Sequence, residues 1–200
     1  MGKKRQSGFT LIELMVTVTM FVVFSSMFLF SYPRFSENYR LDRAASEIAG
    51  VFSEAQSRAL GIASSGSGQF PGFGVYFNLS TPREYVLFSD NNADGFYNSG
   101  EEVKRVSLES PLPLITSLCH NTETNPPGTC VSSGSARLDI VYLFKIGPEP
   151  VITLFFNGSV IPNYSDAEIV VRGPLGTGRG IIPWVTGYTE IKRCPDASSC

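Results

Sequence analysis

The hydrophobic pattern divides the first third of the chain into two helical segments. Apolar residues are nearly continuous from Phe9 to Tyr32, a run of 24 residues in which Glu13 is the only charged side chain. A helix of that length can cross a bilayer with some tilt. From Leu41 to Ile62 apolar residues recur every three or four positions instead, which predicts an amphipathic helix packed against a sheet. Together they predict one helix from Phe9 to about Leu60, with a kink at Pro33.

The pattern changes to short strands after a Gly- and Ser-rich stretch from Gly61 to Gly72, which predicts a surface loop. Runs of Val, Ile, Phe and Tyr between turn residues then predict strands and no second helix. The predicted strands are Gly74–Leu79, Glu84–Phe88, Val103–Leu108, Leu114–Leu118, Leu138–Phe144, Val151–Phe156, Glu168–Arg172 and Thr186–Lys192. A glycine-rich loop is expected from Gly173 to Gly180. The expected fold class is α+β: a long N-terminal helix followed by an antiparallel β-rich domain.

Charge around the apolar run predicts its orientation in a membrane. Lys3, Lys4 and Arg5 precede it, and basic residues stay on the cytoplasmic side. The run is longer than the apolar core of a secretory signal, and no small-x-small cleavage site closes it. We expect a single-pass protein of the inner membrane, with its N-terminus in the cytoplasm and its β-rich domain outside.

Glu13 carries most of the functional information. A carboxylate five residues into a spanning helix is costly, so it needs a partner or a position near the interface. Gly8-Phe9-Thr10-Leu11-Ile12-Glu13 resembles the cleavage junction of type IV pilins and type II secretion pseudopilins. The basic leader, the glycine, the phenylalanine, the glutamate at its offset and the long apolar helix all occur together. The chain is thereby identified as similar to class III prepilins.

The resemblance implies processing and assembly. A prepilin peptidase would cut after Gly8 and methylate the new terminus at Phe9, and Glu13 would pair with the Phe9 amine of a neighbouring subunit. A buried carboxylate and a buried ammonium stabilise each other when both are present. The implied partners are this peptidase, other pilin or pseudopilin subunits and the inner membrane. The chain would consist of a leader (1–8), a transmembrane and filament-core helix (9–32), an amphipathic helix (33–62) and an extracytoplasmic domain (63–200).

A helix followed only by strands is most similar to the GspH/FimT group of minor pilins. Local patterns that resemble this group are Ala55-Gln-Ser-Arg-Ala59, the acidic turn after Phe88, Phe156-Asn-Gly158, and a terminal hairpin through Ile169–Val171 and Thr186–Ile191. The resemblance does not choose between a type IV pilus and a type II secretion pseudopilus.

Four cysteines lie in the segment expected outside the cytoplasm, where disulfides persist. Three pairings are possible. We favour Cys119 with Cys130 and Cys194 with Cys200, because each pair closes a loop rich in Pro, Gly, Ser or Thr. Zinc is not favoured, because no Cys-x-x-Cys occurs and the single histidine, His120, is expected in a surface loop.

The segment from Asp90 to Glu101 has the oxygen spacing of a calcium loop. The candidate ligands are Asp90, Asn92, Asp94, the Phe96 carbonyl, Asn98 and Glu101, with Gly95 at the turn. Asp, Asn and Gly also cluster in ordinary turns, where side chains bond their own backbone. Both interpretations stay open here: calcium is a possible ligand, and no other cofactor is expected.

Enzyme and DNA-binding functions have little support in the sequence. No nucleophile elbow, P-loop or dinucleotide motif occurs, and one histidine cannot build a triad. DNA is an unexpected partner, because Arg172, Arg179, Lys192 and Arg193 are scattered in a chain of net charge −2. The competing class is an uncleaved, single-pass membrane protein whose domain is a binding module.

Overall fold

The computed structural model describes residues 9–63, 72–109, 113–123, 128–143 and 151–194. The chain forms two compact units, residues 1–37 and residues 38–200. Helix α1 (Leu11–Ala63) runs through both and is continuous at Pro33, which confirms the predicted long helix. We call residues 9–37 the N-terminal segment and residues 38–63 the domain helix.

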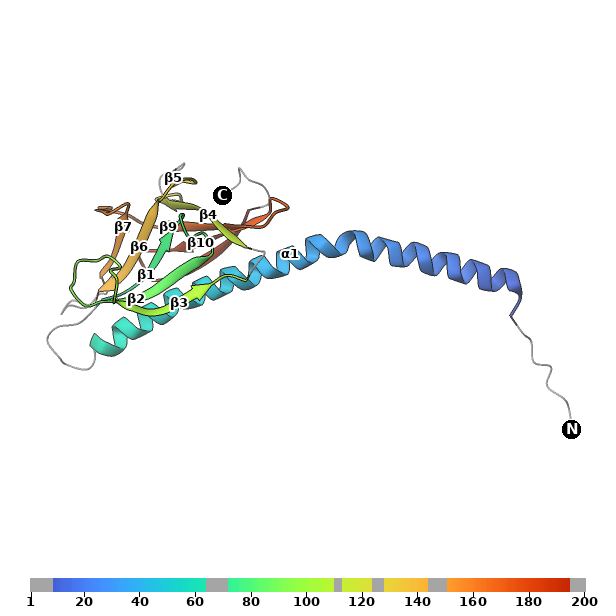
Figure 1. Cartoon of the computed structure of the whole chain (residues 1–200), viewed down its shortest axis with the longest axis horizontal. Helices are drawn as coiled ribbons and strands as arrows, with labels where there is room; N and C mark the ends of the chain where they lie inside the picture. The colour runs from blue at the N-terminus through green and yellow to red at the C-terminus, as the bar shows by residue number, and fades with distance from the viewer. Residues whose placement is uncertain (1–8, 64–71, 110–112, 124–127, 144–150, 195–200) are drawn as a thin grey trace, which may run out of the picture. The chain divides into compact units, whose positions relative to one another are not determined.

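Two antiparallel sheets make up the β-rich domain (Figure 1). The larger sheet has the order β3 (Glu102–Ser107), β2 (Glu84–Asp90), β1 (Gly72–Asn78), β6 (Arg137–Leu143), β7 (Val151–Phe156) and β8 (Ser159–Val160). The smaller sheet has the order β11 (Thr189–Cys194), β10 (Gly178–Pro183), β9 (Ala167–Arg172), β4 (Leu114–His120) and β5 (Thr129–Val131). The α+β fold class is therefore confirmed.

All eight predicted strands are present with small shifts at their ends, but three strands were not predicted. They are β5, β8 and β10. The predicted loop from Gly173 to Gly180 is wrong in its last residues, which begin β10. The predicted terminal hairpin is wrong as well, because β10 lies between β9 and β11. Gly178 allows β10 to approach β9 closely. A Cβ atom at this position would lie only 2.9 Å from the Val171 carbonyl oxygen.

The main core lies between the domain helix and both sheets. Residues with less than a tenth of their surface exposed recur along the helix: Leu41, Ala44, Ala45, Ile48, Val51, Phe52, Ala55 and Ala59. The Phe52 ring lies 5.9 Å from the ring of Phe77 on β1. The same cluster includes Ile181 on β10. The three- and four-residue spacing of the domain helix thus becomes its buried face.

Candidate functional site

The N-terminal segment begins with a helix cap. Thr10 Oγ1 accepts a hydrogen bond from Glu13 N–H at 3.4 Å, so Thr10 and Glu13 hold the positions of a capping box. The Glu13 side chain is exposed, and a carboxylate in the first turn also suits the helix dipole. This local role was missed in the sequence, although Thr-x-x-Glu is its signature. Gly8 lies outside the described residues, and Phe9 is 83% exposed.

Large apolar side chains cover the surface of the N-terminal segment. Among them are Leu11, Ile12, Leu14, Met15, Val16, Val18, Met20, Phe21, Val22, Val23, Phe24 and Met27, all between 47% and 77% exposed. The helix is long and apolar enough to cross a membrane, and no residue of its most apolar window is buried within the molecule. An apolar surface of this extent marks a membrane or protein contact.

The predicted calcium loop folds into a compact turn whose oxygens accept hydrogen bonds from its own backbone. Asp90 accepts from Asp94 N–H at 3.2 Å and from Gly95 N–H at 3.0 Å. Glu101 accepts from Asn91 N–H at 3.3 Å and from Asn98 N–H at 2.9 Å. Asp90 is fully buried and Glu101 is 8% exposed. These bonds are those expected of an ordinary turn rich in Asp and Asn.

Asp94 lies at the centre of this turn. Its carboxylate accepts hydrogen bonds from Phe96 N–H and from the side-chain amides of Asn92 and Asn98 at 2.8–2.9 Å. Burial acts to raise the pKa of Asp94, but the hydrogen bonds outweigh burial and lower the pKa. Within the described ranges, no group of three or more His, Cys, Asp or Glu side chains is arranged to hold a metal ion. Calcium binding stays a prediction.

The aromatic residues of the loop pack onto the outer face of the larger sheet. Tyr85 and Leu87 on β2 belong to the main core, whereas Val86 and Phe88, which alternate with them, belong to a second cluster. That cluster also contains Val141 and Phe155, and Phe96 and Tyr97 pack against it. Phe96 lies 4.5 Å from Phe155, ring to ring. We call residues 90–101 the covering loop.

An ion pair on β6 holds the covering loop in place. Asp139 is fully buried, accepts hydrogen bonds from Arg137 at 2.7 and 3.0 Å, and accepts one from Tyr97 N–H at 3.0 Å. Arg137 donates in turn to the Tyr97 carbonyl at 2.8 Å. Burial raises the pKa of Asp139, against the effect of Arg137. In the sequence, the signal for this ion pair is the presence of Arg137 and Asp139 in a strand that is otherwise apolar.

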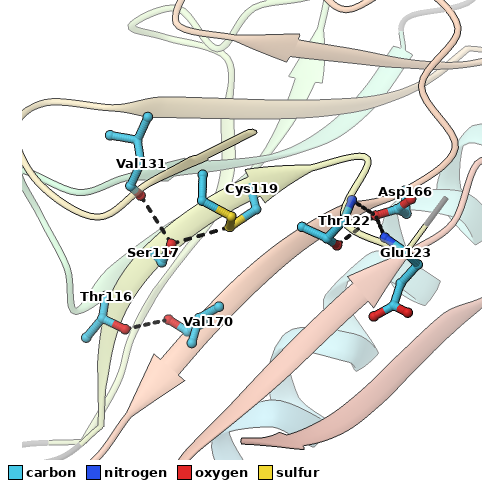
Figure 2. The surroundings of a disulfide bond; sticks show 9 residues. Thr116, Ser117, Cys119, Thr122, Glu123, Val131, Asp166 and Val170 are labelled. Atoms are coloured by element: carbon cyan, nitrogen blue, oxygen red, sulfur yellow. Dashed lines mark hydrogen bonds between the residues drawn. A yellow bond between two sulfur atoms is a disulfide. The ribbon is translucent and has the colours of Figure 1, made fainter. Parts of the chain in front are cut away.

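The predicted Cys119–Cys130 disulfide is present (Figure 2). The two residues are directly opposite each other on β4 and β5. The segment after β4 is anchored by Asp166, which accepts hydrogen bonds from Thr122 N–H, Thr122 Oγ1 and Glu123 N–H at 2.7–3.3 Å. Cys194 is buried at the end of β11. Its predicted partner, Cys200, lies outside the described residues.

His120 is not a surface-loop residue, contrary to the sequence prediction. It ends β4, and its ring contacts the edge of Phe156 at 5.2 Å between centroids. Its Nδ1 atom is buried and has no hydrogen-bond partner among the residues that the structure describes. Burial lowers the pKa of His120, so the ring is neutral at pH 7. Strand β4 continues two residues beyond its predicted end, and this places His120 in the sheet.

The four C-terminal cations have different surroundings. Arg179, expected in a loop, is a β10 residue that is 3% exposed and bonded to Asp42 on the domain helix. Lys192 forms an ion pair with Glu123 at 2.7 Å. Arg172 donates a hydrogen bond to the Gly176 carbonyl at 3.3 Å, and Arg193 is exposed. Arg179 is therefore unable to contribute to a surface for phosphates.

A pocket of 520 Å³ lies where the β5–β6 and β7–β8 turns meet. Its lining consists of Val131, Ser133, Ser135, Ala136, Arg137, Asn157 and Gly158. None of the residues predicted as sites from the sequence lies in it.

The comparison with protein families identifies the N-terminal signal. The family model described as "Prokaryotic N-terminal methylation motif" matches residues 3–29. This range contains the basic leader, the Gly8–Phe9 junction, Glu13 and most of the apolar run. It supports a type IV pilin-like protein with a membrane-anchoring helix and implies processing by a prepilin peptidase. No curated protein and no solved structure matched the chain.

Proposed function

We propose that the chain is a structural subunit, a minor pilin or pseudopilin, which is cut after Gly8, methylated at Phe9 and assembled into a type IV pilus or a type II secretion pseudopilus. The observation that carries this proposal is the methylation motif at the start of a helix whose apolar surface is exposed. In the precursor the membrane would cover this surface. In the filament the same surface would pack against other subunits.

Glu13 would act in assembly through its charge. Processing would place a methylated amine on Phe9, four residues before Glu13, and the carboxylate would pair with the amine of a neighbouring subunit. The Glu13 side chain is exposed, so a partner from outside the chain can reach it. In low-dielectric surroundings the loss of one member of such a pair is costly, because the other charge stays buried without its counterion.

The order of helix and strands in the domain supports our proposal that the chain resembles the GspH/FimT group within this superfamily. One helix is followed only by strands in the described residues, as the resemblance to that group implies. Phe156-Asn-Gly158 forms the tight turn between β7 and β8, with positive φ at Asn157 and Gly158. The role we propose is assembly rather than catalysis, with the N-terminus starting in the cytoplasm and the domain outside.

The first experiment measures the mass and the N-terminal residue of the protein recovered from membranes that contain a prepilin peptidase. Loss of residues 1–8 and a methylated Phe9 are expected. A Gly8→Leu variant, as the control, should keep the leader. Recovery of an intact Met1 terminus beside an active peptidase would instead support the uncleaved, membrane-anchored binding module.

The second experiment separates the charge of Glu13 from its capping role. Gln can also occupy the third position of a capping box, so Glu13→Gln keeps the cap and removes the charge. We expect normal membrane insertion and cleavage, but loss of incorporation into filaments. Normal incorporation of Glu13→Gln would contradict the pairing with the Phe9 amine.

A further inference from the structure

The buried Arg179 of β10 makes polar contacts with the domain helix. Its Nε atom donates to Asp42 Oδ1 at 2.6 Å, and its Nη2 atom donates to Asn38 Oδ1 at 3.4 Å. Its Nη1 atom donates to the Gly178 carbonyl at 2.7 Å. Every nitrogen of the guanidinium is thus engaged, two of the three by the helix.

These contacts lie at the first turn of the domain helix. Asn38 is the first residue of the second compact unit, and Asp42 follows one turn later. The apolar contacts of the helix begin in the same turn, at Leu41, which is 1% exposed. Ionic and apolar contacts of the domain helix therefore occur in the same turn, at Asp42 and Leu41.

The ion pair is asymmetric in its surroundings. The Arg179 side chain is 4% exposed, whereas the Asp42 side chain is 49% exposed. Arginine keeps its charge in proteins, so removal of Asp42 leaves a buried cation without its counterion. Water can still hydrate Asp42 when Arg179 is removed. Loss of the contact is therefore more costly for Arg179, which is buried, than for Asp42, which water can hydrate.

We propose that Arg179 is a positioning residue that fastens the first turn of the domain helix and thereby fixes the point at which the helix leaves the domain. This inference rests on the proposed function for its consequence. In a filament the N-terminal segment would be packed among other subunits, and the Arg179–Asp42 contact would fix the position of each domain on its helix. Variants that break the contact would be cleaved and inserted but would assemble poorly.

Hydrogen exchange of the full-length protein in detergent tests the contact independently of assembly. Asp42→Ala is expected to speed exchange of the helix amides from Asn38 to Ala45 about tenfold, with little change in β1 and β6. Asp42→Glu should restore slow exchange. Asp42→Asn, which keeps an acceptor, is the milder variant if Asp42→Ala does not fold, and it should speed exchange in the same turn.

Two control variants make the outcome decisive. Arg43→Ala removes the neighbouring surface pair with Glu109, whose side chains are 61% and 65% exposed, and should leave exchange unchanged. Val141→Ala weakens the second cluster, on the outer face of the larger sheet, and should speed exchange in all elements. Unchanged exchange in Asp42→Ala, or the uniform pattern of Val141→Ala, would overturn the proposal.

Filament incorporation is the second readout. Asp42→Ala is expected to lose most incorporation, while Val141→Ala at matched thermal stability loses little. Equal losses in both variants would show that stability alone matters and would overturn the positioning role. If the wild type is neither cleaved nor incorporated, the proposed function fails, and the exchange data still decide whether Arg179 fastens the helix.

Discussion

The two parts of helix α1 have the same backbone structure and opposite surfaces. In the domain helix, apolar residues form one face, and residues such as Ile48 and Ala55 have no exposed surface. In the N-terminal segment apolar residues surround the helix, and the most apolar window has no buried residue. The apolar face of the domain helix packs within the domain, whereas the exposed apolar surface of the N-terminal segment marks a membrane or protein contact. Secondary structure alone would not show this division of tasks.

The largest expected effect comes from a charge placed in the domain helix. Ile48→Asp would bury an unpaired carboxylate in the main core, at a cost of about 4 kcal/mol or more, and should prevent folding of the domain. Val22→Asp, in the N-terminal segment, should leave the thermal unfolding of the detergent-solubilised domain unchanged. The exposed Ser46→Asp is the control for charge on the domain helix. Similar losses from Ile48→Asp and Val22→Asp would contradict the division.

The next effect concerns the outer face of the larger sheet, which the domain covers by itself. Phe96→Ala removes a half-buried ring that contacts Phe155, and we expect it to lower the free energy of unfolding by about 2 kcal/mol. Phe96→Leu should retain much of the stability. Urea unfolding measures both variants. No loss in Phe96→Ala would mean that the covering loop does not contribute to the core.

The sequence predicted those elements whose signals are local. The three- and four-residue spacing from Leu41 to Ala59 is enough to identify the buried face of the domain helix. The run of Ile, Val, Tyr and Leu from Ile140 to Leu143 is enough to place β6. The processing motif is also a short, continuous stretch around Gly8 and Glu13. Each of these signals is complete within one helix, one strand or one junction.

The features that were missed depend on contacts between distant parts of the chain. Gly178 and Gly180 favour a loop locally, but pairing with β9 and β11 makes them part of a strand. Arg179 contacts Asp42 across 137 positions, and no local pattern marks such a pair. Phe96 and Tyr97 lie within an acidic turn, and only the folded sheet shows that they cover its outer face.

Calcium tests whether the covering loop depends on the chain alone or on a bound ion. A ligand that binds only the folded state raises stability in proportion to the logarithm of its concentration. If the loop is a plain turn, EDTA and millimolar calcium should give the same melting temperature. A rise with calcium that disappears in Asp94→Asn would support the calcium interpretation, and Glu109→Gln, outside the loop, is the matched control.

The smallest expected effect compares two carboxylates that form no ion pair within the described part of the chain, Glu13 in the N-terminal segment and Glu168 in the domain. Glu168 is 2% exposed, and no described residue forms a hydrogen bond with its buried Oε1 atom. Burial raises the pKa of Glu168, against the effects of Lys192 and of a hydrogen bond with Thr122, and nearby carboxylates raise it further. The charged form is therefore disfavoured in the folded state. Glu168→Gln should raise the melting temperature slightly at pH 7.

The pH dependence gives the sign of this effect. A raised pKa means that the folded state binds the proton of Glu168 more tightly than the unfolded state does. Glu168 therefore lowers the stability of the fold as pH rises above the ordinary pKa of glutamate. The advantage of Glu168→Gln should be largest at neutral pH and shrink as pH falls toward that value. Thermal unfolding from pH 4 to 8 measures it. A lower melting temperature for Glu168→Gln at neutral pH would mean that the domain needs this charge, just as we propose that assembly needs the charge of Glu13.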